Sequence, residues 1–531
     1  MLVLFLGIFA LQASALDPGK TLTQYAHRIW GQEEGLFQPT IYSILQTRDG
    51  FLWLGTQDSL IRFDGMRFRE FDGGAQALFQ HSLIRALLED KQGNLWTGSI
   101  GSGVAKIGPD GAVTRYTTKE GLPSDSVFCI ASDSQNRIWI CTNEGLARLD
   151  HGQVRVFTTA DGLPTNQIRS TCEASDGTRW IAGLDFGLSR SKGARFERYS
   201  DSQISPEVNI TSLYCASDGN VWVGKGSGLT QIGPGFSRSF SVRDGLPDDA
   251  VSSLAGGPDG SLWIGSNDGI SRYRHGEISV YRTRDGLSHS SVLSLYVDRE
   301  GSLWAGTKDG LDQFTDGKVT PYTTNEGMLS NDAGPVLEDA TGNLWIGTLG
   351  RGLNSFDGHR FRSLTTKDGL VDNTILSLET GTENDIWVGT KSGLNRLSDG
   401  KVVSTYTQRD GLSGPEVQAL FMDVGGTLWA GTNKGLNRFD GTQFTKAGID
   451  PRANPNGVIA LRGAHNVQLF VSTDGGAFYY LRDNAFNSFP LKGVIHPVGS
   501  YYNDHVNHSE WMGTLGSGLL RWQNGTLARI R

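Results

Sequence analysis

The sequence has few cysteines, no excess of positive charge and no long apolar run. It contains 531 residues, of which 4 are cysteine, and its formal net charge is −8. Non-specific nucleic-acid binding requires a basic face, so this charge predicts no nucleic-acid partner. No run of about 20 apolar residues occurs, which predicts no transmembrane helix. Walker loops, HExxH helices, GxSxG turns and CxxC pairs are also missing, which argues against several common enzyme classes.

The four cysteines are sparse and irregularly spaced, at Cys129, Cys141, Cys172 and Cys215. Small secreted domains that depend on disulfides have a much higher density of cysteine. We therefore interpret these residues as small apolar side chains of the core and predict no disulfide framework.

The first 15 residues, MLVLFLGIFALQASA, form a short apolar stretch. It is too short to span a bilayer and ends in small residues, as secretory signal peptides do. We expect residues 1–16 to be a signal peptide, cleaved before Leu16 or Asp17, and the mature chain to be periplasmic or otherwise extracytoplasmic. No basic residue precedes the apolar core, which leaves open a start further upstream, and the alternative is a buried N-terminal strand.

Tryptophan, in contrast, recurs with a regular period. Eleven of the 13 tryptophans are spaced by 41 to 43 residues, except that the last gap is twice as long and has Phe470 at its midpoint. The chain therefore contains twelve repeats, the period of a β-propeller blade. The tryptophans in register are Trp53, Trp96, Trp139, Trp180, Trp222, Trp263, Trp304, Trp345, Trp387, Trp429 and Trp511.

Each repeat has the pattern of four short strands. Residues 124–159 divide into SDSVFCIASD, RIWICT, LARLD and QVRVFTT, separated by tight turns, and Asp-Gly pairs recur at the same turns in other repeats. Asp-Gly between β-rich runs is a strong hairpin signal. We predict an all-β fold of twelve four-stranded blades, in which each Trp-x-Gly places a large and a small side chain on one face for packing between blades. The tryptophans are thus assigned a structural role.

A second motif, an acidic residue followed by glycine and usually leucine, joins the fourth strand of most repeats to the first strand of the next. Its carboxylates suit backbone N–H groups of the turn, and no copy has the ligand spacing of a calcium loop. We also considered zinc at His289 and at the cluster His496, His505 and His508, but converging ligands are not indicated. We predict no metal and no cofactor.

The recurring unit, as in DGLSHSSVLSLYVDREGSLWAGTKDGLDQF at 285–314, resembles the two-component regulator propeller repeat. The segment 22–65 is similar to the start of periplasmic sensors of that family, and the resemblance covers residues 22–531. It implies an extracytoplasmic sensor built of two consecutive seven-bladed propellers, followed by a small β-sandwich, a transmembrane helix and a kinase, cyclase or transcription-factor output, with oligosaccharide ligands in gut-bacterial hybrids. The motif residues are structural, so no ligand site is transferred. None of the parts that follow the propellers precedes Arg531, so we expect a truncated receptor without enzymatic activity.

The ends of the repeat array predict how the rings close. Residues 23–30, TQYAHRIW, occupy the place of a fourth strand and would complete the seventh blade by pairing near residues 310–315. We therefore expect a first propeller over residues 17–316 and a second, incomplete five-blade ring over 317–531. A six-plus-six arrangement, which leaves 525–531 spare, is the alternative.

In a propeller, the loops from fourth to first strands and from second to third strands share the face around the channel mouth. Ligand-binding residues are best sought there, at positions where the repeats differ. The mixture of amide, carboxylate and basic groups suits a small polar ligand such as an oligosaccharide, with Phe37 and Phe186 as stacking candidates and Asp249 in the same loops. The predicted ligand-binding residues are Asp125, Asn143, Glu144, Asn166, Arg169, Asp185, Asn209, Lys225, Asp248, Asn267, His289 and Lys308.

Three functions compete. The first is a sensory module that passes ligand occupancy to a membrane-bound signalling output, with dimerisation of the intact receptor. The second is a propeller lyase of the streptogramin-lyase type, for which His289 and Glu144 lie in loops of the right face but share no motif. The third is a non-catalytic scaffold that binds proteins on its outer face.

Overall fold

The computed structural model describes residues 16–531, apart from 72–81, 164, 185–186, 194, 202–203, 205–208, 384, 450–456, 465–466, 483–484, 489–497, 505–508, 515, 517, 524–525 and 531. The chain forms two compact units, Met1–Pro321 and Tyr322–Arg531. The predicted signal peptide, apart from Leu16, lies outside the described residues, and so do Asp185, Phe186, His496, His505 and His508.

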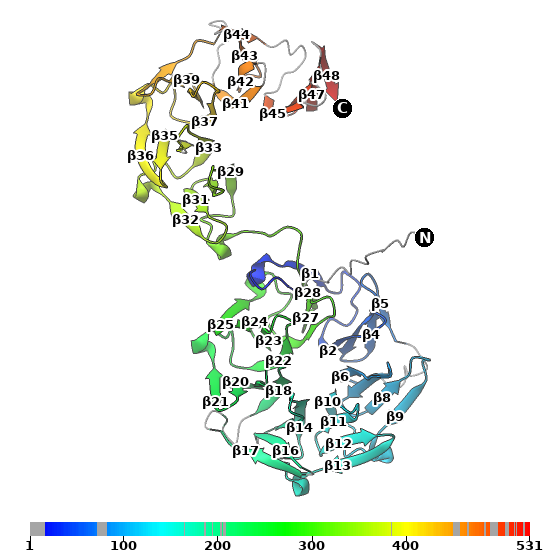
Figure 1. Ribbon diagram of the computed structural model, residues 1–531. Coiled ribbons are helices and arrows are strands. Elements are labelled where there is room, and N and C mark those ends of the chain that lie inside the picture. The colour runs from blue at the N-terminus through cyan, green and yellow to red at the C-terminus, as the bar shows by residue number, and fades with distance from the viewer. Residues whose placement is uncertain are drawn as a thin grey trace, which may run out of the picture. The chain divides into compact units, whose positions relative to one another are not determined.

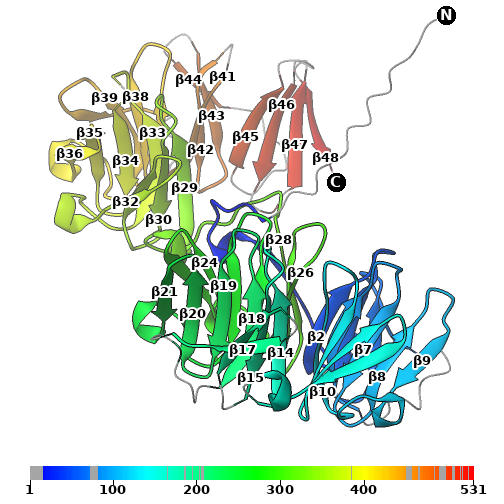
Figure 2. The same cartoon turned by 60° about the horizontal axis from the view of Figure 1, so that its bottom comes forward.

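Twelve antiparallel sheets of four strands each make up the described chain, which confirms the predicted all-β fold of twelve blades (Figures 1 and 2). In eleven of them the four strands are consecutive in the sequence, as expected from the tight turns of each repeat. The glycines of these turns adopt positive φ, for example 91° at Gly50 and 84° at Gly177. Glycine reaches this region without steric cost, which is why Asp-Gly marks the hairpins.

The first unit contains seven sheets. Their strands, sheet by sheet, are β2 (Ile41–Gln46), β3 (Leu52–Thr56), β4 (Leu60–Phe63) and β5 (Phe68–Glu70); β6 (Ile84–Glu89), β7 (Leu95–Ser99), β8 (Gly103–Ile107) and β9 (Val113–Tyr116); β10 (Val127–Ser132), β11 (Ile138–Thr142), β12 (Leu146–Asp150) and β13 (Gln153–Phe157); β14 (Ile168–Glu173), β15 (Arg179–Gly183), β16 (Leu188–Lys192) and β17 (Arg195–Tyr199); β18 (Ile210–Cys215), β19 (Val221–Lys225), β20 (Gly228–Gly233) and β21 (Phe236–Phe240); β22 (Val251–Gly256), β23 (Leu262–Ser266), β24 (Gly269–Arg274) and β25 (Glu277–Tyr281); and β26 (Val292–Val297), β27 (Leu303–Thr307), β28 (Leu311–Thr315) and β1 (Ala26–Trp30).

The second unit contains the other five sheets. Their strands are β29 (Ala333–Glu338), β30 (Leu344–Thr348), β31 (Leu353–Phe356) and β32 (Phe361–Leu364); β33 (Ile375–Thr380), β34 (Ile386–Thr390), β35 (Leu394–Ser398) and β36 (Lys401–Tyr406); β37 (Val417–Met422), β38 (Leu428–Thr432), β39 (Gly435–Phe439) and β40 (Phe444–Lys446); β41 (Val458–Ala464), β42 (Val467–Thr473), β43 (Phe478–Arg482) and β44 (Ala485–Ser488); and β45 (Val498–Asp504), β46 (Ser509–Thr514), β47 (Gly518–Gln523) and β48 (Thr526–Ile530).

Single 3-10 turns are the helical elements of the described residues. One precedes β1, and the others lie in connections from a fourth strand to the next first strand, except that η6 follows β28. They are η1 (Leu22–Gln24), η2 (Thr118–Glu120), η3 (Thr159–Asp161), η4 (Val242–Asp244), η5 (Thr283–Asp285), η6 (Thr324–Glu326), η7 (Thr366–Asp368) and η8 (Gln408–Asp410).

The N-terminal strand completes the seventh sheet. β1 pairs antiparallel with β28, from Ala26 opposite Thr315 to Trp30 opposite Leu311, as the sequence analysis predicts for this strand. His27 Nε2 lies 2.8 Å from Oδ1 of the buried Asp312. The first and seventh sheets then share one apolar cluster, in which Trp304 lies against residues of β2 to β4, so the seven sheets of this unit form a closed ring (Figure 1).

The repeat tryptophans of both units, apart from Trp511 of the last sheet, are buried between neighbouring sheets. Trp139, for example, is 5% exposed and packs with Phe157 of its own sheet and Ile181 of the next sheet. In five sheets the indole Nε1–H also donates to a carboxylate six residues earlier, as from Trp96 to Asp90 at 2.8 Å. Each indole thus fills an apolar interface while its polar edge is satisfied at the first hairpin turn.

In most sheets the small residue of the Trp-x-Gly faces a small residue of the first strand. Gly55 is opposite Ser43, and a Cβ built on Gly55 would lie 2.2 Å from the Ser43 hydroxyl oxygen. In the third sheet the same two positions are Cys141 and Cys129, which are opposite each other in the ladder and form a disulfide. This cross-strand bond therefore occupies the place that serine and glycine fill in the first sheet.

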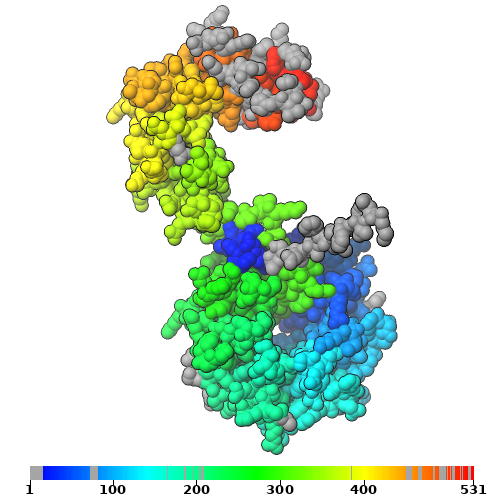
Figure 3. All heavy atoms as spheres, viewed as in Figure 1, coloured from blue at the N-terminus to red at the C-terminus, as the bar shows by residue number. Residues whose placement is uncertain are grey.

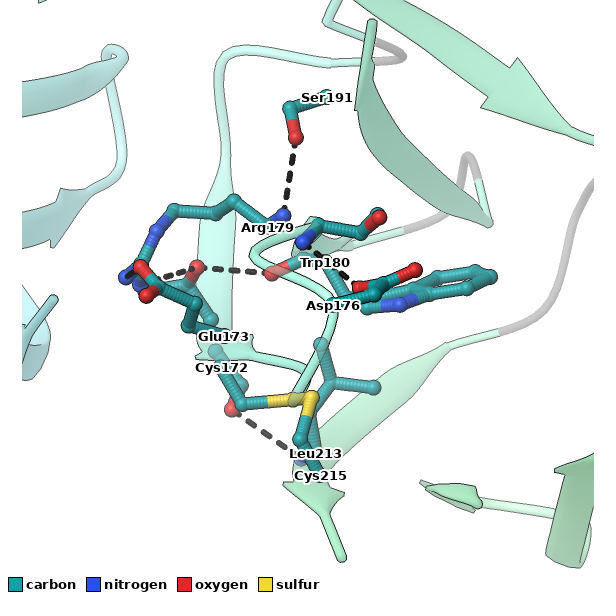
Figure 4. Close-up of a disulfide and its surroundings, with 11 residues drawn as sticks. Cys172, Glu173, Asp176, Arg179, Trp180, Ser191, Leu213 and Cys215 are labelled. Carbon is teal, nitrogen blue, oxygen red and sulfur yellow. Dashed lines mark hydrogen bonds and ion pairs between the residues drawn. A yellow bond between two sulfur atoms is a disulfide. The ribbon is translucent and has the colours of Figure 1, made fainter. Parts of the chain in front are cut away.

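The prediction of cysteines without disulfides is wrong for both pairs. The second bond joins Cys172 of β14 to Cys215 of β18, so it links the fourth sheet to the fifth (Figure 4). Among the side chains around it, Arg179 pairs with Glu173 at 2.7 Å. The irregular spacing concealed the pairs, because one bond follows the register within a hairpin and the other joins equivalent strands one repeat apart.

Candidate functional site

The loops of the predicted ligand-binding face are built around a capped turn. In η2 the Thr117 side chain and backbone N–H contact the Glu120 carboxylate, and Gly121 ends the turn with φ 98°. The same arrangement recurs at η3, η4, η7 and η8. The acidic residue of the acidic-Gly-Leu motif therefore bonds backbone N–H groups, as the sequence analysis predicts.

Two of the predicted ligand-binding residues brace this turn. The Thr118 N–H donates to Asp125 Oδ1 at 2.7 Å, and the Thr159 N–H donates to Asn166 Oδ1 at 3.0 Å. Asp249 makes the same bond with Val242, and Asn331 and Asn373 make it in the second unit. Asp125 and Asn166 therefore each use one side-chain oxygen to accept a backbone hydrogen bond of the turn. This seven-residue spacing was not recognised as structural from the sequence alone.

A small polar cluster forms where the sixth and seventh sheets meet. His289 Nδ1 accepts a hydrogen bond from the Ser291 N–H at 2.9 Å, and the Ser291 hydroxyl donates to Asn267 Oδ1 at 3.4 Å. The structure thus brings His289 and Asn267 together through Ser291. An accepting Nδ1 places the ring proton of a neutral His289 on Nε2.

The remaining predicted residues differ in burial. Lys225 is 5% exposed, and burial lowers the pKa of its ammonium group. Asn143 has a buried Oδ1 without a hydrogen-bond partner among the described residues. Asp248 Oδ1 accepts from the Ala250 N–H at 2.7 Å. The others are exposed or lie outside the described residues: Glu144, Asn209 and Lys308 are exposed, and Asp185 is not described.

Sequence reasoning missed a group of residues on the inner strands. The first strands of neighbouring sheets contact one another around the ring axis, and Figure 1 shows them innermost. At the second position of the first four inner strands are Tyr42, Arg85, Phe128 and Arg169, of which only Arg169 was predicted. The Arg169 guanidinium carbon lies 3.7 Å from the centroid of the Phe128 ring. A charged or aromatic residue at this strand position, different in each repeat, was the available signal.

The cavities described lie elsewhere on the two units. One of about 400 Å³ is bordered by Tyr214, Gly256 and Asp298 at the ends of inner strands of the first unit. Another of about 700 Å³ lies between the first two sheets of the second unit, where Arg360, Arg362, Asp357 and Glu383 are among its lining residues. A third, of about 250 Å³, is lined by Trp30 and Trp304. None of these three cavities is lined by a predicted ligand-binding residue.

The described residues contain neither a metal cluster nor a membrane-spanning helix. No group of three or more histidine, cysteine or acidic side chains in the described part of the chain could hold a metal ion. Within the same residues, no helix has the length and apolar character needed to cross a bilayer.

Comparison with known proteins identifies the repeats. The profile of the family described as two component regulator propeller matches residues 35–58, 79–101, 121–144, 245–268 and 286–309. Five of the twelve described sheets therefore contain a stretch similar to the two-component regulator propeller repeat. All five matched stretches lie in the first unit and contain an inner strand and the tryptophan strand that follows it. Three of them begin at the glycine that ends a capped turn, at Gly121, Gly245 and Gly286. No curated protein sequence matches the chain.

The chain is also similar to several solved structures. The extracellular domain of the hybrid two-component system BT3049 from B. thetaiotaomicron is 21% identical with a TM-score of 0.59, over 94% of this chain and 77% of that chain. The extracellular domain of BT4673 from the same organism is 18% identical with a TM-score of 0.47, over 96% and 79%. Virginiamycin B lyase from Staphylococcus aureus, solved with quinupristin, is 16% identical with a TM-score of 0.46, over 55% and 99%.

Proposed function

We propose that this chain is the extracytoplasmic ligand-sensing module of a two-component receptor. The observation that carries the proposal is the match to regulator propeller repeats in five stretches of a closed seven-sheet ring. The apolar and turn positions of the repeat are used for packing and capping. The positions that differ between repeats are therefore the ones available for recognition.

The two disulfides support export of the chain. Disulfides persist in the periplasm and other oxidising compartments and are rare in the cytosol. Both Cys129–Cys141 and Cys172–Cys215 lie in the first unit. They agree with the proposal that residues 1–16 are a secretory signal peptide and that the mature protein is periplasmic or extracytoplasmic.

We place the ligand at the face of the first propeller formed by the capped turns and the second-to-third loops. The free acceptor of Asn143, the buried Lys225 and the linked pair His289 and Asn267 supply hydrogen-bonding groups of both kinds. Such groups suit a hydroxyl-rich ligand, and an oligosaccharide is the ligand class we propose. In the intact receptor, occupancy would be passed to a membrane-bound output, with dimerisation as one route.

In our proposal the two units have different roles. Residues 17–316 form the seven-bladed ring that binds ligand. Residues 317–531 form the second, incomplete ring, in which five sheets pack one after another. This arrangement of seven plus five remains our proposal, as do the ligand and the dimer.

A thermal-shift screen tests the proposal. A ligand that binds only the native state raises the melting temperature. We expect at least one oligosaccharide of a panel of neutral and acidic glycans to raise it, and the double variant N143A/K225Q to reduce the shift. No shift with any glycan would contradict the sensor proposal.

Turnover of a cyclic ester or lactone by the purified chain would instead support the lyase alternative. That alternative needs a general base and acid that converge on one substrate. No hydrogen bond joins His289 to Glu144, and His289 Nδ1 is occupied by the Ser291 N–H.

A further inference from the structure

The second residue of each inner strand is set apart by a β-bulge. In all seven sheets of the first unit the register between first and second strands shifts between the first and third residues of the inner strand, as between Val127 and Cys129. A bulge leaves one residue unpaired and re-aims its side chain. The ring therefore has seven bulged residues near one end of its inner strands.

These bulged positions differ sharply around the ring. The first four sheets carry Tyr42, Arg85, Phe128 and Arg169, so aromatic and cationic side chains alternate. The hydroxyls of the fifth and sixth, Thr211 and Ser252, bond the backbone carbonyls of Val251 and Val292. The seventh is Leu293. Among the seven bulged positions, the charged and aromatic side chains therefore all lie in the first four sheets. The fifth and sixth positions carry small side chains whose hydroxyls already have hydrogen-bond partners, and the seventh carries leucine. We call Tyr42, Arg85, Phe128 and Arg169 the inner belt.

Arg85 has no anionic partner within the belt. No ion pair or hydrogen bond of its side chain occurs among the described residues, and the electrostatic neighbour it has there is the Tyr42 phenol. Neighbouring atoms partly desolvate the guanidinium and lower its pKa, but the Arg85 side chain as a whole is exposed. An anion that approaches from solvent can therefore reach this guanidinium and form charge-assisted hydrogen bonds with it.

Arg169 and Phe128 add a second element to the belt. The guanidinium carbon of Arg169 stands 3.7 Å from the ring centroid of Phe128, across the contact between β14 and β10. The contact with the aromatic ring orients the guanidinium, and a guanidinium carries five N–H donors, which suit it to recognise an oxyanion. The aromatic residues on either side of Arg85 supply apolar surface for the body of a small ligand.

We propose that the inner belt binds the anionic group of a small ligand, a carboxylate or a sulfate, between Arg85 and Arg169. This inference rests on the proposed sensing function and deepens it, because it names an acidic saccharide as the ligand class. The equivalent bulge-level residues of the second unit, among them Leu376, Gln418 and Ile459, carry no charge. The anion site therefore belongs to the first unit alone among these positions.

The test measures binding of three probes to the full chain by isothermal titration calorimetry. The probes are D-glucuronate, inorganic sulfate and D-glucose, which separate a carboxylate, a sulfate and a neutral sugar. The variants are R85Q and R169Q, and the matched control is R243Q, which removes the same charge from an exposed residue of η4, outside the inner belt. Far-ultraviolet circular dichroism and the melting temperature report whether each variant is folded.

We expect glucuronate or sulfate to bind and glucose not to bind at the same concentration. R85Q is expected to weaken anion binding at least tenfold, R169Q to weaken it by a similar factor, and R243Q to leave it within twofold, since charge-assisted contacts are lost only in the first two. Rising salt should weaken the binding further.

Unchanged affinity in folded R85Q, or binding of neither anion, would overturn the inner-belt site. If a neutral oligosaccharide raises the melting temperature while neither anion binds, the sensing function survives and the anion site does not. If sulfate binds through Arg85 but no saccharide of any kind binds, the site stands as an anion site and the saccharide-sensing proposal fails.

Discussion

The two units are built from the same repeat but differ in what surrounds it. In the first unit, β1 completes the seventh sheet, two disulfides cross strands or sheets, and charged residues occupy the bulges of the inner strands. In the second, the described sheets pack in sequence, and Trp511 of the last sheet is only partly buried. The comparison shows that the repeat specifies the blade and its packing partner, whereas closure of the seventh sheet depends on β1, which lies before the first matched repeat. In Figure 3 the atoms of the first unit, coloured from blue to green, surround a narrow central opening.

The largest effect on stability is expected when two equivalent tryptophans, one in each unit, are replaced. Trp304 is 6% exposed and lies between the seventh and first sheets, where Trp30 stacks on it at 5.5 Å. Trp511 lies in the last sheet and is partly buried. We expect Trp304→Ala to lower the free energy of unfolding by about 3–5 kcal/mol and Trp511→Ala by about 1 kcal/mol, because only the first leaves a large cavity.

Denaturant unfolding followed by circular dichroism measures both changes. The control is Trp304→Phe, which keeps part of the ring and should cost less than the alanine variant. Equal losses at the two tryptophans would show that the last sheet is as well covered as the sheets of the closed ring.

The second prediction concerns the disulfides of the first unit. Cys172–Cys215 closes a 43-residue separation and Cys129–Cys141 one of 12. In the chain-entropy description these contribute about 4 and about 3 kcal/mol, and measured values are commonly about 2–4 kcal/mol. We expect C172S/C215S to lower the melting temperature of the first unit more than C129S/C141G does. Calorimetry resolves the effect if the second unit unfolds in a separate transition.

C129S/C141G is a matched control because it recreates the Ser–Gly pair that the first sheet has at Ser43 and Gly55. It removes the bond while it keeps the packing. Adding a thiol reductant to either double variant should have less effect than adding it to the unchanged protein. A melting temperature of C172S/C215S equal to that of the unchanged protein would contradict a stabilising bond between sheets.

The third prediction concerns the pH dependence of stability at two aspartates, Asp298 and Asp339, whose carboxylates accept hydrogen bonds from the repeat tryptophans. At Asp298, in the first unit, burial outweighs the hydrogen bonds and raises the pKa. At Asp339, in the second unit, burial also acts to raise the pKa, but bonds from Thr341, Trp345 and Asn343 outweigh it and lower the pKa to about 2. Asp339 therefore stabilises the fold above its unfolded pKa, and this contribution is lost as pH falls from about 4 to about 2.

The two variants should respond to acid in opposite directions. Asp339→Asn should cost about 1–3 kcal/mol at pH 7, because a buried acceptor is lost, and the difference from the unchanged protein should shrink toward pH 2. For Asp298 the sign reverses, since a raised pKa means that the unchanged protein gains stability relative to Asp298→Asn as pH falls through that pKa. Urea midpoints between pH 7 and pH 3 measure both trends, and parallel trends would contradict this assignment.

The fold was accessible from the sequence because its determinants recur. The tryptophan strand and the Asp-Gly turns recur along the chain and indicate the same hairpins each time. A wrong assignment at one position therefore does not change the predicted fold. Cys129 and Cys141 were missed because a disulfide depends on register across a hairpin. Arg85 was missed because a bulge leaves no mark in the alternation of apolar residues. The one signal in the sequence was that the residue at this strand position changes from repeat to repeat.

The smallest expected effect on stability concerns the asparagines that brace the turns, and it tests whether one of them also binds ligand. Asn166 in the first unit and Asn331 in the second accept the same backbone N–H bond, at 3.0 and 2.9 Å. Replacing either by alanine should cost about 1 kcal/mol, the usual value of one such bond. If Asn166 also binds ligand, N166A should lose affinity in calorimetric titration whereas N331A should not. Equal affinity of the two variants would leave Asn166 as a brace of the turn, and recognition would then rest on the inner strands rather than on the loops.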